Sequence, residues 1–76
     1  MASDDPAIAF HYGLALLSLD PARYADKAGA LLTVAANTAP RDAFETNIRD
    51  EARRLSLVMA SKGPMAAAAS AAAAYL

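Results

Sequence analysis

Four prolines divide this 76-residue chain into segments and constrain its fold more than any other feature. Proline donates no amide hydrogen and has a fixed backbone angle, so it suits the first turn of a helix and disrupts the interior. Asp5-Pro6 and Asp20-Pro21 each place a capping aspartate before a proline. In Gly63-Pro64, the proline follows a glycine that is expected to end the preceding helix. Pro40, with Thr38 as a nearby cap, fits the same role. No segment alternates apolar and polar residues as a strand does.

These signals predict an all-α fold, a small bundle of three to four helices built on an antiparallel helical hairpin. Residues 1–76 are expected to form a single helical domain, with helices over about residues 6–19, 21–37, 40–61 and 65–75. The third helix has the clearest pattern, because apolar residues recur every three or four positions and are predicted to face the core: Phe44, Ile48, Ala52, Leu55 and Met59. Glu45–Arg49 and Asp50–Arg54 are expected to form ion pairs on its exposed side.

Alanine supplies 22 of the apolar residues and buries little surface, so the core of this small chain is expected to be thin. There is no cysteine, which excludes a disulfide and a thiolate metal site. Stability must then come from oligomerisation or from a partner chain. The first helix points the same way, because only His11 and Ser18 interrupt its apolar surface and a helix that is apolar nearly all round is buried on several sides.

The last segment, residues 65–75, is almost entirely alanine. Alanine has the highest helix propensity, yet an isolated helix of this length is marginal in water. Two alternatives therefore stay open, a helix docked in a tight groove and a frayed C-terminus. Its apolar run is too short to span a bilayer, and the acidic N-terminus does not resemble a signal peptide. We expect a cytoplasmic protein without membrane contact, and the abundance of alanine and arginine indicates a bacterial or phage source.

No constellation of residues carries recognisable chemistry. His11 and Ser18 lie seven residues apart, about 10 Å along a helix, which is too far for a nucleophile and its base. A single histidine cannot build a metal site, and phosphate-binding glycine loops are absent. We therefore expect no enzyme activity, no catalytic residue, no metal, no cofactor and no small-molecule substrate.

The formal charge of −1 gives no reason to expect binding to nucleic acid. Arg41, Arg49, Arg53 and Arg54 form the one basic cluster, and acidic residues are interleaved with it. A solvated face or a contact with a protein is the first interpretation. A small nucleic-acid-binding regulator using this third helix is the alternative.

The string from Phe10 to Leu17, followed by a loop and by Asp26-Lys27-Ala28, Leu32, Ala35 and Pro40, resembles one tetratricopeptide or Sel1-like repeat. The resemblance covers residues 10–40 and implies an antiparallel helix pair of the kind found in protein-binding scaffolds. The turn around residues 20–24 is about three residues longer than in the tetratricopeptide pattern. The glycines that follow the first helix in Sel1-like repeats are missing, and solenoids need about three repeats.

Together these features predict a protein–protein interaction module, acting as a small adaptor, accessory subunit or inhibitor. It would dock through the apolar first helix and the alanine-rich C-terminal helix, onto another protein chain or onto itself as a homo-oligomer. The residues expected to contact the partner are Phe10, Leu14, Leu17, Arg49, Arg53, Tyr75 and Leu76.

Overall fold

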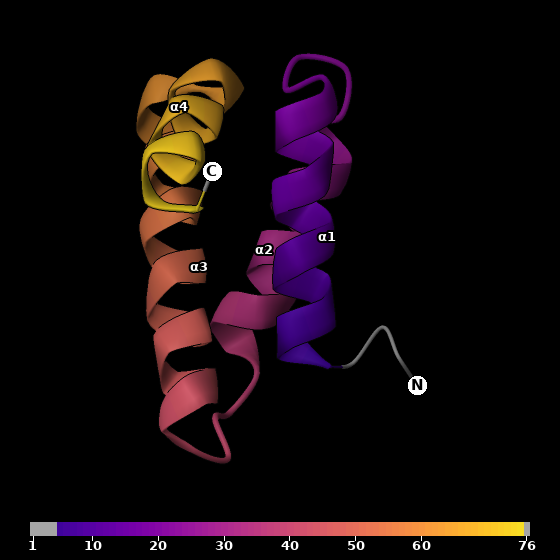
Figure 1. The fold of residues 1–76 in the computed structure, drawn as a ribbon. Coiled ribbons are helices and arrows are strands. Elements are labelled where there is room, and N and C mark those ends of the chain that lie inside the picture. The colour runs from indigo at the N-terminus through magenta and orange to yellow at the C-terminus, as the bar shows by residue number, and fades with distance from the viewer. Residues whose placement is uncertain (1–4, 76) are drawn as a thin grey trace.

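The computed structural model describes residues 5–75, apart from the side chain of Tyr75, as four α-helices. These are α1 (Pro6–Leu19), α2 (Ala25–Asn37), α3 (Ala43–Lys62) and α4 (Pro64–Tyr75). Helices α1 and α2 form an antiparallel pair, α3 runs back beside them, and α4 packs across the end of α3 (Figure 1). The predicted all-α bundle built on a helical hairpin is confirmed.

Helix α1 begins where the sequence places it. The Asp5 carboxylate accepts hydrogen bonds from the backbone N–H of Ala7 (2.9 Å) and of Ile8 (3.3 Å), and Pro6 occupies the first turn. These contacts satisfy amide groups that have no partner within the helix. The helix ends at Leu19, because Asp20 takes an extended backbone while its N–H still donates to the Leu16 carbonyl.

Helix α2 begins at Ala25, four residues after the predicted start, and Asp20 is not its N-cap. The Asp20 side chain instead accepts from the Arg23 N–H (3.1 Å), and its carbonyl accepts from the Tyr24 N–H (3.0 Å). These two bonds close a separate turn over residues 21–24. Tyr24 then departs from helical geometry, with ψ of 15°, and caps α2 without a side-chain hydrogen bond.

Helix α3 begins three residues later than predicted, because Asp42 is its cap rather than Thr38. The Asp42 carboxylate accepts from the Glu45 N–H at 2.8 Å. Thr38 belongs to the end of α2, where its hydroxyl donates to the Val34 carbonyl at 2.7 Å. At the other end Gly63, with φ of +95°, ends α3 as predicted, and α4 follows at once.

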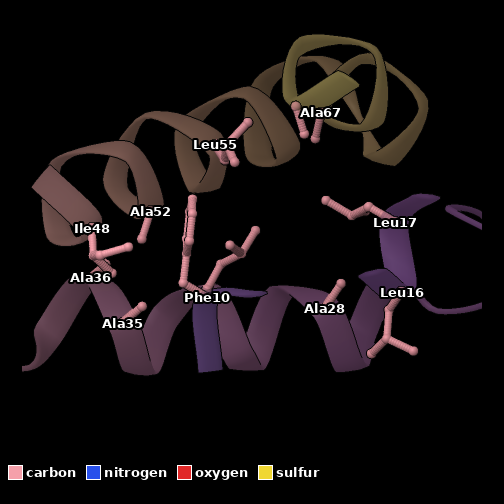
Figure 2. Packing of buried hydrophobic residues seen from close by; sticks show 12 residues of the cluster. Phe10, Leu16, Leu17, Ala28, Ala35, Ala36, Ile48, Ala52, Leu55 and Ala67 are labelled. Carbon is pink, nitrogen blue, oxygen red and sulfur yellow. The ribbon is translucent and has the colours of Figure 1, made fainter. Parts of the chain in front are cut away.

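The core combines four fully buried large side chains, Phe10, Leu17, Leu32 and Leu55, with alanines from all four helices. Figure 2 shows Phe10 and Leu17 projecting from α1 toward the residues of α3 and α4. The alanines let the helices approach closely. Gly13 of α1 faces the backbone of α2, where an added Cβ would lie in ordinary van der Waals contact, 3.5 Å from the carbonyl oxygen of Ala28.

Two predictions for α3 are wrong. Phe44 is 58% exposed, whereas Ile48, Ala52 and Leu55 are buried as expected. Phe44 lies in the first turn of α3, and the buried residue there is Glu45. The expected ion pairs also differ, because the arginines join other carboxylates: Arg41–Glu45, Arg49–Asp50 and Arg54–Glu51.

The hydroxyl oxygen of Ser56 in α3 is buried and has no hydrogen-bond partner among the described residues. An unpaired buried polar group costs about 1–3 kcal/mol, and alanine also has the higher helix propensity. We therefore expect Ser56→Ala to raise the free energy of unfolding by about 1 kcal/mol, measured by urea denaturation. Ser61→Ala is the control, because the Ser61 hydroxyl is exposed and already donates to the Leu57 carbonyl. A loss of stability in Ser56→Ala would contradict this reading.

Candidate functional site

The outer side of α1 is apolar and exposed. None of its fourteen residues is an aspartate, glutamate, lysine or arginine. Ile8, Tyr12 and Leu19 are 51%, 45% and 73% exposed, and their spacing of four and seven residues places them on one stripe. We call these three residues the outer face of α1. Exposed apolar side chains gathered in one place are typical of an interaction surface.

The neighbouring helix α2 borders this face. The Lys27 ammonium lies 5.4 Å from the centre of the Tyr12 ring, in a cation–π contact that holds the ring against the hairpin. Val34, also on α2, is 39% exposed. Lys27 therefore places a positive charge at the border between this face and α2.

The predicted contact residues of α1 lie elsewhere. Phe10 and Leu17 are each 1% exposed, so they belong to the core and cannot reach a partner while the bundle is folded. Because both side chains are buried, the prediction that Phe10 and Leu17 form a docking surface is wrong. Leu14 is half-buried and packs at the edge of the core. The side chain of Tyr75 and all of Leu76 lie outside the described residues.

The two arginines predicted to contact a partner are engaged within the chain. Arg49 pairs with the neighbouring Asp50, with 3.2 Å between Nη2 and Oδ1. Arg53 Nε donates to the carbonyl oxygen of Ala36 at 3.2 Å, near the C-terminal end of α2. A cation is favourable there because helix C-termini carry partial negative charge. Arg53 therefore ties α3 to α2, and nothing in these contacts favours the nucleic-acid alternative.

Arg41 and Glu45 form a coupled ion pair at the start of α3. Glu45 accepts from both the backbone N–H (2.9 Å) and the guanidinium of Arg41, although its side chain is nearly buried. The hydrogen bond from the Arg41 side chain is the main cause that lowers the pKa of Glu45 below its ordinary value, followed by the bond from the Arg41 backbone. The pair fixes the loop that leads into α3.

The Arg41–Glu45 pair is expected to make the stability of the fold depend on pH in the acidic range. A carboxylate with a lowered pKa in the folded state stabilises the fold above its unfolded pKa, and the contribution is lost as the pH falls through the folded value. We expect Glu45→Gln to unfold more easily than the wild type at pH 7 and to differ less from it as the pH falls below 4. Thermal melts across that range measure the difference. Asp50→Asn is the control on the same helix, and an equal pH response in both variants would contradict the assignment.

A groove of about 660 Å³ lies between α1 and α4, on the other flank of α1 from α2. Among the described residues, its lining is apolar except for His11 and Ser18. The apolar lining residues come from the C-terminal part of α1, the following turn and α4: Leu14, Ala15, Leu17, Pro21, Met65, Ala68, Ala69, Ala71 and Ala72. Helix α4 is therefore docked rather than frayed over its described length, with Ala67 and Ala71 buried against the bundle. Its other side forms one wall of the groove.

His11 and Ser18 do not form a catalytic pair. His11 Nδ1 donates to the carbonyl oxygen of Ala7 at 2.7 Å, within its own helix. Within residues 5–75, no group of three histidine, aspartate or glutamate side chains is placed to hold a metal ion. No helix in the described part of the chain is long and apolar enough to cross a membrane.

Comparison with protein families, with curated proteins and with solved structures finds no match to this chain. The resemblance of residues 10–40 to a tetratricopeptide or Sel1-like repeat stays a prediction.

Proposed function

We propose that this chain is a protein–protein interaction module that docks through the outer face of α1. The observation that carries the proposal is the exposure of Ile8, Tyr12 and Leu19 on a helix without charged residues. Transfer of a fully exposed leucine or isoleucine from water into an interface is favourable by about 1.5–3 kcal/mol. Three partly exposed side chains on one stripe can therefore anchor a partner helix. An adaptor, an accessory subunit and an inhibitor all work through such a surface.

The partner that this face fits is a second copy of the chain. In a two-fold symmetric dimer the same patch meets itself, so residues near the axis face their own copies. A charged face would then bring like charges together, which is destabilising. The outer face of α1 has no such charge, and Lys27 lies only at its border with α2. Pairing of α1 with α1 would cover all three exposed side chains at once.

Sedimentation equilibrium of leucine variants tests this contact. Leu19→Glu should raise the dimer dissociation constant more than tenfold, because each dimer loses two buried leucines and gains two like charges. Leu57→Glu is the matched control, because Leu57 on α3 is 71% exposed, compared with 73% for Leu19. It should leave the dissociation constant within about threefold of the wild type, since surface changes cost little. Equal effects of the two variants would contradict docking through α1.

A further inference from the structure

The groove between α1 and α4 contains none of the three residues of the outer face of α1 and has the properties of a small-molecule site. Pockets for small ligands measure about 300–1,000 Å³ and are mainly apolar, with a few polar groups that orient the ligand. The volume of about 660 Å³ and the apolar lining with two polar side chains fall within that description. Such a site goes beyond the docking function proposed above and does not depend on it.

The chemical character of the lining indicates what charge a ligand can carry. None of the described residues that line the groove is an aspartate, glutamate, lysine or arginine. An ion that leaves water for an apolar site is strongly disfavoured unless an opposite charge meets it. Among these described residues, a carboxylate or phosphate ligand would meet no lysine or arginine, and an ammonium ligand would meet no carboxylate. The occupant should therefore be uncharged.

The hydrogen bond of His11 further defines the head group of the ligand. A carbonyl oxygen only accepts, so the 2.7 Å contact with Ala7 means that Nδ1 carries the hydrogen. In the neutral ring Nε2 is then a bare acceptor. Because Nδ1 is directed to the backbone of α1, Nε2 lies on the side of the ring away from it. A ligand hydroxyl can donate to this nitrogen, whereas an ether cannot.

We propose that the groove binds a small uncharged amphiphile of the linear-alcohol type. Its alkyl chain lies against the alanine wall of α4, where side chains such as Ala69 and Ala72 leave room for it. Its hydroxyl donates to His11 Nε2. Ser18 lies seven residues further along α1, about 10 Å away, and offers a second polar contact to a longer ligand.

The proposal is tested by titrating the wild-type protein at pH 8 with four probes that each carry an eight-carbon chain, while amide chemical shifts are recorded. The probes are 1-octanol, methyl octyl ether, octanoate and octylammonium. We expect saturable 1-octanol binding with shifts concentrated along the groove. The ether should bind about two- to tenfold more weakly, as expected for the loss of one hydrogen bond. The two ions should bind more than tenfold more weakly than 1-octanol.

Two variants locate the site independently of the probe chemistry. Ala72→Phe fills the groove and should weaken 1-octanol binding at least tenfold, whereas Ala30→Phe, at an exposed position of α2 outside the groove, should not change it. Circular dichroism confirms that both remain folded, and the probe series on the wild type needs neither variant. Equal binding of all four probes, absence of saturable 1-octanol binding, or shifts away from the groove would overturn the proposal.

Discussion

Phe10→Ala is expected to lower the free energy of unfolding by about 3–5 kcal/mol, the usual cost of replacing a buried phenylalanine. Phe10 is 1% exposed and projects from α1 toward Ala52 and Leu55 of α3 (Figure 2). Domains of this size are stabilised by only about 4–11 kcal/mol in total. The variant should therefore be partly or wholly unfolded at room temperature. Chemical denaturation followed by circular dichroism measures the loss.

Phe44→Ala is the matched control, since Phe44 is the second of the two phenylalanines of the chain. Its side chain is 58% exposed in the first turn of α3, so truncation should cost no more than about 1 kcal/mol. The two variants make the same chemical change at a buried and at an exposed site. Equal losses, or a larger loss for Phe44→Ala, would contradict the packing of α1 against α3.

Ala67→Asp should be nearly as damaging, with an expected loss of at least 3 kcal/mol. Ala67 is completely buried where α4 packs on the bundle, and the core cluster to which it belongs consists of apolar side chains. A carboxylate placed there must either remain uncompensated or take up a proton, and both outcomes are costly. Loss of α4 from the bundle would expose the residues beneath it, so the melt should lose cooperativity or shift sharply downward.

Ala69→Asp makes the same change two residues along α4, at an exposed position. The backbone and the distance from the helix N-terminus are similar, so its effect should stay within about 1 kcal/mol. A thermal melt of each variant provides the comparison. Similar melting temperatures would show that α4 is frayed, the alternative that the sequence leaves open.

The helix boundaries show which features of the fold can be predicted from local sequence signals. The Asp5-Pro6 start and the Gly63 end are local signals, and both are found in the structure. Asp20-Pro21 carries the same local signal, yet Asp20 closes a turn of its own. Local capping chemistry is shared by helix starts and isolated turns. Only the packing of the hairpin decides between them.

The orientation of α1 could not be predicted for a related reason. A helix that is apolar nearly all round has no polar side to mark its exposed face. Phe10 and Leu17 were predicted to contact a partner and are buried, whereas Ile8 and Leu19 are exposed. The involvement of α1 in an exposed apolar surface was predictable from its composition. Which residues form that surface depends on where α2, α3 and α4 pack.

The groove between α1 and α4 could not be predicted from the sequence either. Its two walls come from residues about 50 positions apart, and an alanine run shows no sign of the side that will face a cavity. His11 and Ser18 share a stripe of α1, which the spacing of seven residues does reveal. Their position beside α4 follows only from the tertiary fold.

The most direct test of docking through α1 is the molar mass of the wild-type protein in solution, measured by light scattering at several concentrations. We expect the mass to rise with concentration to twice 7.9 kDa and no further, because a two-fold contact closes on itself. A mass of 7.9 kDa that stays constant up to millimolar concentration would contradict it.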